Sequence, residues 1–414
     1  MEVKVQTSNK ISGKVKSPPS KSYAHRQIIG AYLSKTPTTL IGAGRSQDVL
    51  ATLNCLKEVG LNYEYIGDDV NLSFNSFSQN KLLNCNESGS TLRFLLPVIS
   101  ALGINATFTG SNRLLERPIK NLVDCLNANG ANISGFTING KLKAGEYNIA
   151  GNVSSQYITG LLFALPLLDG DSKIIINEQM VSKGYVDITI DVLKSFNIVA
   201  EEKDYGYYIK GNQKYQSKEQ IVVEGDYSGS AFTLCLGALG DGVEVTNLNK
   251  NSCQGDKEIL NVLKKFGAIV ESTKSGYFVK KGNLIGQVID CENIPDLVQI
   301  ISVLASYSKG KTILKNVSRL KIKESDRIEG ILTNLKVAGI DAKYNGSDLI
   351  INGGSPKSGK FLGFNDHRSV MSAVCLATFA SGESIVTDSL AINKSYTNFY
   401  KDYVSLGGKV NGDI

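Results

Sequence analysis

The stretch Pro18-Pro-Ser-Lys-Ser-Tyr-Ala-His-Arg26 places a serine-rich cap before an apolar helix, and comparable openings recur along the chain. They begin at Ser20, Ser88, Ser154, Asp226, Asp296 and Asp366. Successive copies lie 66 to 72 residues apart in a chain of 414 residues. Self-similarity at a nearly constant period indicates a repeat architecture. The openings therefore predict six copies of one structural module.

Each copy continues in the same order. After the cap come an apolar helix, a turn, a short β-branched strand, a second and amphipathic helix, and further strands. The second helix usually ends at a glycine that suits the left-handed position after a helix, as at Gly60, Gly130, Gly267 and Gly339. The pattern predicts an α/β fold.

The length predicts two similar domains, because a chain of 414 residues exceeds one hydrophobic core. We expect three modules in each domain, with residues 15–224 forming the N-terminal domain. Residues 1–14 and 225–414 would form the C-terminal domain, since a leading strand at Glu2–Val5 could pair with the C-terminal half. Ligands are expected in the cleft between the two domains.

Composition excludes several functional classes. The net charge is only +6 and no run of five basic residues occurs, which argues against a nucleic-acid partner. The longest apolar runs, such as Leu161–Leu168, are too short to span a membrane, and the first residues do not resemble a secretory signal. Seven scattered cysteines without a CxxC pair and only two histidines predict reduced thiols, no metal site and a cytoplasmic protein.

The eight arginines point to anionic ligands. Lysine is by far the commoner basic residue, so an arginine is expected where a planar, bidentate donor is needed. Arg26, Arg93 and Arg368 lie in opening turns, where helix N-termini favour anions. Random surface charge is the alternative interpretation of this distribution.

Individual openings differ in chemistry. Lys21 and Arg26 could meet an anion at the first helix, and Gly89 would let a ligand approach the backbone beside Arg93. Asp296 is either an ordinary helix cap or a general base. The charged run Lys321–Arg327 is either a solvated face or part of a site. These residues suit two anionic ligands that react with each other, without a cofactor.

Five motifs carry a resemblance to the 5-enolpyruvylshikimate-3-phosphate synthase family along nearly the whole chain. They are Pro-Ser-Lys-Ser…Arg at 19–26, Glu-Arg-Pro-Ile at 116–119, Ser-Ser-Gln at 154–156, Lys-Glu-Ser-Asp-Arg at 323–327 and Asp-His-Arg at 366–368. The resemblance implies two domains of three βαβαββ units each, an inside-out α/β barrel. It also implies transfer of the enolpyruvyl group from phosphoenolpyruvate to the 5-hydroxyl of shikimate 3-phosphate, with release of phosphate. Nothing in the sequence demands more than a monomer.

The resemblance assigns site residues by motif. Shikimate 3-phosphate would contact Lys21, Ser22, Arg26, Ser154, Ser155, Gln156, Ser182, Asp296, Arg319 and Lys323. Phosphoenolpyruvate would contact Lys21, Gly89, Arg93, Arg117, Gln156, Arg327, Arg368 and Lys394. Catalysis would involve Lys21 and Asp296, which takes the hydroxyl proton, and Glu324 with Lys323, which handle the proton at the methylene. Retention of Gly89 implies inhibition by glyphosate.

Two alternatives remain. One is the related enzyme that transfers enolpyruvyl to UDP-N-acetylglucosamine. Its members commonly carry a reactive cysteine where this chain has Asn112, and usually have Asn where this chain has Ser22. The other is a non-catalytic six-repeat scaffold, which has no need for Asp296, Glu324 and the clustered arginines together.

Overall fold

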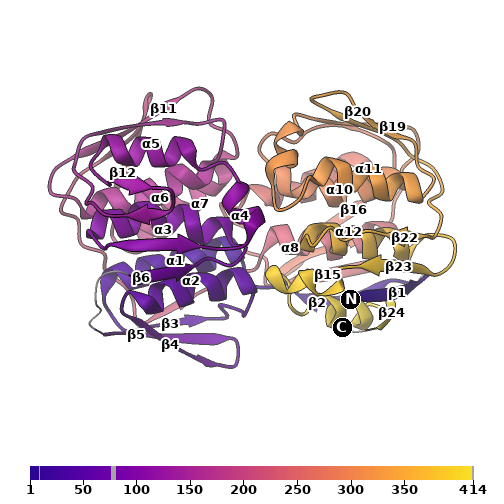
Figure 1. The fold of residues 1–414 in the computed structure, drawn as a ribbon. Helices are drawn as coiled ribbons and strands as arrows, with labels where there is room; N and C mark the ends of the chain where they lie inside the picture. Colours follow the sequence, from indigo (N-terminus) through magenta and orange to yellow (C-terminus); the bar gives the residue numbers. More distant parts are fainter. Residues whose placement is uncertain (9, 76–80, 413–414) are drawn as a thin grey trace. The chain divides into compact units, whose positions relative to one another are not determined.

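A computed structural model describes residues 1–8, 10–75 and 81–412 (Figure 1). The chain divides into two compact units. The N-terminal unit comprises Lys21–Val223, and the C-terminal unit combines Met1–Ser20 with Glu224–Ile414. Within the described ranges, no helix combines the length and the apolar character that crossing a membrane requires.

The described strands form six four-stranded sheets with one topology. In every sheet, one edge strand pairs parallel with its neighbour. The other two pairings across the sheet are antiparallel. The N-terminal unit holds the sheets β14 (Gln220–Val222), β3 (Thr38–Ile41), β5 (Asp69–Phe74), β4 (Leu61–Ile66); β6 (Lys81–Asn84), β7 (Ala106–Thr109), β9 (Thr137–Ile138), β8 (Ile133–Ser134); and β10 (Glu146–Ala150), β11 (Ser172–Asn177), β13 (Gly206–Ile209), β12 (Ala200–Lys203).

The C-terminal unit repeats this arrangement three times. Its sheets are β2 (Ser12–Lys16), β15 (Gly242–Thr246), β17 (Gly276–Lys280), β16 (Ile269–Ser272); β18 (Val288–Asp290), β19 (Lys311–Lys315), β21 (Leu349–Asn352), β20 (Ala342–Tyr344); and β22 (Lys360–Phe361), β23 (Ser384–Thr387), β1 (Glu2–Gln6), β24 (Lys409–Gly412). The predicted pairing of the leading strand with the C-terminal half is confirmed, because β1 lies between β23 and β24.

Strands distant in the sequence complete the first sheet of each unit and the last sheet of the C-terminal unit. β14 supplies the edge strand of the first sheet, and β2 does the same for the fourth. Residues 15–20, which the sequence assigns to the N-terminal domain, lie in the C-terminal unit because β2 pairs with β15 through Lys16. After β2, Pro19 forms an isolated antiparallel β-bridge with Gly225.

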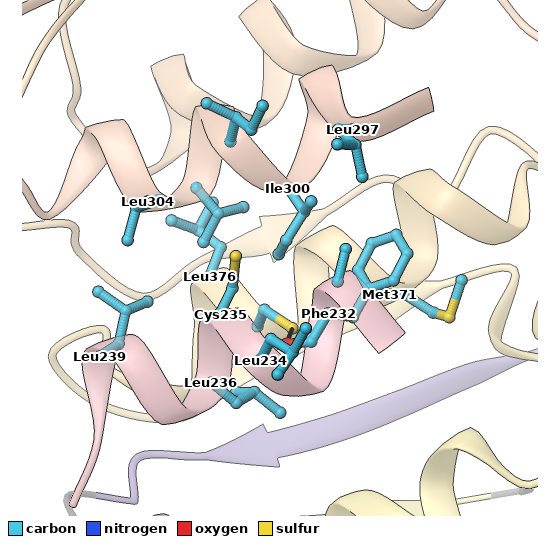
Figure 2. Packing of buried hydrophobic residues seen from close by; sticks show 14 of the residues in the cluster. Phe232, Leu234, Cys235, Leu236, Leu239, Leu297, Ile300, Leu304, Met371 and Leu376 are labelled. Atoms are coloured by element: carbon cyan, nitrogen blue, oxygen red, sulfur yellow. Dashed lines mark hydrogen bonds between the residues drawn. The ribbon is translucent and has the colours of Figure 1, made fainter. Parts of the chain in front are cut away.

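Each module opens with a buried helix. These helices are α1 (Lys21–Ser34), α3 (Gly89–Leu102), α6 (Ser155–Ala164), α8 (Tyr227–Leu239), α10 (Val298–Ser306) and α12 (His367–Thr378). Every residue of α8, α10 and α12 is buried, and α8 and α10 are apolar on nearly all sides, as expected for enclosed helices. Figure 2 shows Phe232 and Leu239 of α8 packing with Ile300 of α10 and Leu376 of α12.

The second, amphipathic helices cover this core. They are α2 (Gln47–Glu58), α5 (Lys120–Ala128), α7 (Lys183–Ser195), α9 (Ile259–Phe266), α11 (Arg327–Val337) and α13 (Phe399–Ser405). The glycines predicted to follow four of them, Gly60, Gly130, Gly267 and Gly339, have φ values of 101°, 97°, 99° and 71°. The left-handed conformation confirms why glycine ends these helices.

Short elements complete the chain. They are α4 (Asn112–Glu116) and the 3₁₀ turns η1 (Leu165–Leu167), η2 (Gly255–Glu258), η3 (Pro295–Leu297), η4 (Ser318–Ile322) and η5 (Ser389–Lys394).

Candidate functional site

Side-chain caps begin the helices at four of the openings, those at Ser88, Ser154, Asp226 and Asp366. These side chains accept hydrogen bonds from the backbone N–H groups of Thr91, Gln156, Ser228 and Arg368, respectively. The aligned peptide dipoles and unpaired N–H groups at a helix N-terminus give the first turn a positive electrostatic potential. Side chains in these first turns therefore lie where the binding of an anionic ligand is favoured.

Asp296 departs from this pattern and is not a helix cap. It lies inside η3, and α10 follows without a side-chain cap. Its carboxylate instead contacts three cations: Oδ1 lies 3.0 Å from Arg327 Nη1 and 3.3 Å from Lys323 Nζ, and Oδ2 lies 3.2 Å from Arg368 Nη2. Arg368 Nη1 also donates to the Asp296 carbonyl at 3.0 Å.

Arg327 joins three carboxylates in the C-terminal unit. Besides Asp296, it contacts Asp366 (Nε to Oδ2, 2.8 Å) and Glu324 (Nη2 to Oε2, 2.8 Å). Its side chain is only 1% exposed. Burial by itself lowers the pKa of Arg327, but the three carboxylates outweigh it and raise the pKa overall. The Arg327 guanidinium therefore stays charged and holds the three carboxylates of the cluster together.

Lys323 and Glu324 are the more accessible members of this cluster. Their side chains are 21% and 25% exposed, so a ligand can reach them. Burial lowers the pKa of Lys323, and the neighbouring Arg327 and Arg319 add to that effect while Asp296 opposes it. A lysine whose pKa is lowered exchanges its proton more readily near neutral pH, which suits acid–base chemistry.

Lys394 lies beside the N-terminus of α12, the helix that Asp366 caps. At the end of η5, it donates from Nζ to the carbonyl of Asn365, which directly precedes the cap residue Asp366. The structure thus brings together seven predicted residues of the C-terminal unit around α11 and α12: Asp296, Arg319, Lys323, Glu324, Arg327, Arg368 and Lys394.

In the N-terminal unit, two guanidinium groups converge on Gly89. A Cβ atom placed on Gly89 would lie 2.7 Å from Arg117 Nη1 and 2.9 Å from Arg93 Nη1. Arg93 Nη1 also donates to Gln156 Oε1 at 2.7 Å, and Gln156 Nε2 donates to Ser90 Oγ at 3.0 Å. Two forked cations at the start of a 14-residue helix form a place that suits a carboxylate or phosphate.

Arg26 donates hydrogen bonds to groups of both α1 and α7. Its guanidinium donates to Thr189 Oγ1 at 2.8 Å, to the Tyr185 carbonyl at 2.9 Å and to the Ser22 carbonyl at 2.8 Å, and it lies 4.8 Å from the centre of the Phe94 ring. Burial lowers its pKa to about 9, which leaves it charged at neutral pH. In this structure Arg26 therefore connects α1 with α7.

The other predicted residues of this unit lie in first helical turns. Lys21 and Ser22 begin α1, Ser155 begins α6 behind its cap Ser154, and Ser182 precedes α7 in a left-handed conformation with φ 56°. Lys21 Nζ lies 2.7 Å from Asp48 Oδ2. Asp48 was not predicted, because nothing in the sequence pairs a residue in the first turn of α2 with Lys21.

A hydrogen-bonded chain of side chains links α1, α2 and α3 beneath Gly89. His25 Nδ1 lies 2.7 Å from Thr52 Oγ1, Thr52 Oγ1 lies 2.7 Å from Thr91 Oγ1, and Thr91 Oγ1 donates to the cap Ser88 Oγ at 2.7 Å. Burial, with the charges of Lys21 and Arg26, holds the pKa of His25 well below 6.5. His25 is therefore a neutral residue that supports the opening of α3, and sequence periodicity gave no signal for it.

A family model described as EPSP synthase (3-phosphoshikimate 1-carboxyvinyltransferase) matches residues 5–403. The chain belongs to the EPSP synthase family. Relatives named 3-phosphoshikimate 1-carboxyvinyltransferase include one from Clostridium kluyveri, 40% identical over 97% of this chain and 96% of its own length, and one from Clostridium perfringens, 38% identical over the full length of both. These names favour this family over the alternative that acts on UDP-N-acetylglucosamine.

Solved structures agree with the enolpyruvyl transferase fold. An EPSP synthase from Acinetobacter baumannii has a TM-score of 0.81 at 23% identity and covers 99% of this chain and 100% of its own. The enolpyruvyl transferase NikO from Streptomyces tendae has a TM-score of 0.79 at 14% identity, with 99% and 98% covered. At these identities the likeness concerns the fold alone, and it confirms the predicted arrangement of βαβαββ units. Across the described ranges, no three His, Cys, Asp or Glu side chains are placed to hold a metal ion.

Proposed function

We propose that this chain transfers the enolpyruvyl group of phosphoenolpyruvate to the 5-hydroxyl of shikimate 3-phosphate, giving 5-enolpyruvylshikimate 3-phosphate and phosphate. The observation that carries the proposal is the clasp around Asp296, in which one carboxylate contacts Lys323, Arg327 and Arg368. Membership in the EPSP synthase family supplies the reaction class.

The clasp explains how a base could be released when substrate binds. The carboxylate and phosphate of phosphoenolpyruvate would compete with Asp296 for Arg327 and Arg368, since a guanidinium binds either group bidentately. Asp296 would then exchange a contact with Arg368 for the 5-hydroxyl of shikimate 3-phosphate. Its proximity to fixed cations would also steady negative charge that develops on the attacking oxygen.

The reaction would proceed by addition and elimination. Glu324 or Lys323 gives a proton to the phosphoenolpyruvate methylene, and the adjacent carbon becomes cationic. The 5-hydroxyl oxygen bonds to that carbon while its proton passes to Asp296. Phosphate then departs with the proton held by Asp296, and the new methyl group loses a proton to Glu324 or Lys323, which restores the double bond and returns all these groups to their starting states.

Residues of the N-terminal unit would bind the same two substrates. Shikimate 3-phosphate would meet Lys21 and the hydroxyl groups of Ser22, Ser154, Ser155 and Ser182, with Gln156 and Arg26 alongside. Phosphoenolpyruvate would lie over Gly89, because only a residue without a side chain leaves Nη1 of Arg93 and Arg117 accessible there. From the C-terminal unit, Arg319 would also contact shikimate 3-phosphate, and Lys394 would also contact phosphoenolpyruvate.

The protein is further proposed to act as a monomer in the cytoplasm. All seven cysteines are free thiols, six of them buried, which is compatible with a reducing compartment. Size-exclusion chromatography with light scattering tests the monomer: a mass near 44.6 kDa is expected, and a stable dimer would contradict it.

Phosphate release from phosphoenolpyruvate tests the proposed reaction. Release is expected with shikimate 3-phosphate present and not with either substrate alone. A parallel reaction replaces shikimate 3-phosphate with UDP-N-acetylglucosamine and is expected to give none. Absence of release with both proposed substrates would overturn the function, and release with UDP-N-acetylglucosamine alone would favour the related enzyme.

A further inference from the structure

The fourth opening, at Asp226, has no ligand assigned to it, yet it touches the proposed site through Ser228. Ser228 lies in the first turn of α8 and is buried, and its backbone N–H donates to Asp226 Oδ1 at 2.9 Å. Its hydroxyl oxygen accepts a hydrogen bond from Arg368 Nη2 at 2.8 Å. These two residues are 140 positions apart in the sequence.

Ser228 gives Arg368 a contact that does not depend on Asp296. The guanidinium also donates to the carboxylate and the carbonyl of Asp296, at 3.2 and 3.0 Å. A substrate anion that displaces the Asp296 carboxylate leaves the bond to Ser228 in place. A long and flexible arginine side chain needs such an anchor if its fork is to keep one orientation.

Asp256 interacts with the hydroxyl of Ser228 in turn. It lies in η2 and is only 4% exposed, and its interaction with the Ser228 hydroxyl lowers the pKa of Asp256 against the effect of burial. A serine hydroxyl has a single proton, and Arg368 can only donate. The Ser228 oxygen accepts from Arg368, so its proton is available to the Asp256 carboxylate. The order of donors runs from Arg368 through Ser228 to Asp256.

The loop that carries Asp256 is itself held firmly against the start of α8. Gln254 Nε2 donates to Glu224 Oε1 at 2.6 Å and to the Gly225 carbonyl at 2.8 Å, and Gln254 Oε1 accepts from the Tyr227 backbone N–H at 3.0 Å. These bonds fasten the segment before Asp256 to the start of α8, where Ser228 lies.

We propose that Ser228 and Asp256 are positioning residues that orient the Arg368 fork toward the anionic groups of phosphoenolpyruvate. The inference rests on the proposed function, in which Arg368 binds that substrate. It gives the fourth opening a role in specificity for anions, although neither residue touches the reacting atoms. Burial and the charge of Asp296 raise the pKa of Asp256 to about 6, and Arg368 opposes that shift. The Asp256 carboxylate therefore interacts electrostatically with both Asp296 and Arg368.

Kinetics of Ser228→Ala test the proposal. We expect KM for phosphoenolpyruvate to rise roughly tenfold, the loss expected for one hydrogen bond to a charged group, with a smaller change in kcat. KM for shikimate 3-phosphate should be unchanged. Asp256→Asn should raise KM for phosphoenolpyruvate less than Asp256→Ala, because the amide oxygen can still accept from Ser228. Ser230→Ala is the matched control: it removes a buried hydroxyl of the same helix that bonds to Ser17 at 2.8 Å, and should leave both KM values unchanged.

A double-mutant cycle with Arg368→Lys separates positioning from a general structural role. If Ser228 acts through Arg368, Ser228→Ala should have little further effect on KM in the Arg368→Lys enzyme. Equal effects in both backgrounds, or an unchanged KM in the single variant, would overturn the inference while the wild-type turnover upholds the proposed function.

The same cycle measured by urea unfolding reports on the contact without any turnover. If the wild-type protein releases no phosphate, the proposed function fails, and coupling between the two positions in unfolding still supports the contact. Additive unfolding effects would overturn it.

Discussion

Arg327 Nε lies 2.8 Å from Oδ2 of Asp366, and both side chains are almost completely buried. Asp366 also caps α12 through the backbone N–H of Arg368 and accepts a hydrogen bond from Ser325. One carboxylate thus fixes the start of α12 and the guanidinium that holds Asp296. The pKa of Asp366 is lowered overall because the charge of Arg327 outweighs the effect of burial. The ion pair therefore stabilises the C-terminal unit and also positions the residues of its proposed site.

Replacing Arg327 with methionine should destabilise the protein by about 3–5 kcal/mol, because it leaves buried Asp366 without its cation. Urea unfolding followed by circular dichroism measures the change. Arg113→Met is the matched control, since its pair with Glu116 is exposed, and it should cost less than about 0.5 kcal/mol. Equal stability of the two variants would show that the buried pair contributes no more than a surface pair.

Asp296→Asn should lower kcat by about 10²–10⁴-fold, because the amide cannot accept the hydroxyl proton. Binding of shikimate 3-phosphate should persist, and isothermal calorimetry measures it beside the phosphate-release assay. Asparagine is preferable to alanine because it keeps an acceptor for Lys323, Arg327 and Arg368. A variant with undiminished kcat would remove the assignment of Asp296 as the base.

Gly89→Ala should raise KM for phosphoenolpyruvate on the order of tenfold, because the new methyl group would displace the guanidinium groups of Arg93 and Arg117. The free energy of unfolding should change by less than about 1 kcal/mol, since alanine suits a helix better than glycine does. Gly330→Ala, whose methyl group would lie 3.3 Å from the Phe364 ring, is the helical control and should leave KM unchanged.

Glyphosate should inhibit the wild-type enzyme, because Gly89 is retained. Phosphate release measured across glyphosate concentrations checks this, and the Gly89→Ala enzyme should be less sensitive because the same displacement closes the space over the helix N-terminus. Indifference of the wild type to millimolar-scale inhibitor would contradict the prediction.

Stability should decline as pH falls below about 6.5, in part through His25. Burial lowers the pKa of His25 in the folded protein, so below 6.5 the unfolded chain binds the proton more strongly. The contribution approaches about 1.4 kcal/mol per pH unit for one residue. Urea unfolding of the wild type and His25→Gln at pH 7, 6 and 5 should show a shallower slope for the variant, whereas the two slopes should agree above pH 7. Parallel curves throughout would exclude His25 as a source of the acid sensitivity.

Several features of the fold follow from local sequence. The caps at Ser88, Ser154, Asp226 and Asp366 were predictable because a capping hydrogen bond joins residues two or three positions apart. The apolar helices behind them and the glycines after the second helices depend equally on nearby residues. Together these signals predicted six modules, and the six sheets have one topology as expected.

Other features depend on which elements pack together. The sequence left open whether Asp296 caps a helix or serves the site, and only the approach of α11 and α12 surrounds it with Lys323, Arg327 and Arg368. Likewise, the contact of Arg26 with α7 and the roles of Asp48, Ser228 and Asp256 became recognisable only through their partners.

The sequence by itself determined the repeat, the helix openings and, through its motifs, the family to which the chain belongs. The tertiary structure decided which carboxylate faces which cation, and that β1, β2 and β14 close sheets begun elsewhere in the chain. The physical reason is range. Caps and helix ends are hydrogen bonds between neighbours in sequence, whereas ion pairs such as Arg368 with Asp296, 72 positions apart, exist only after separate modules have packed.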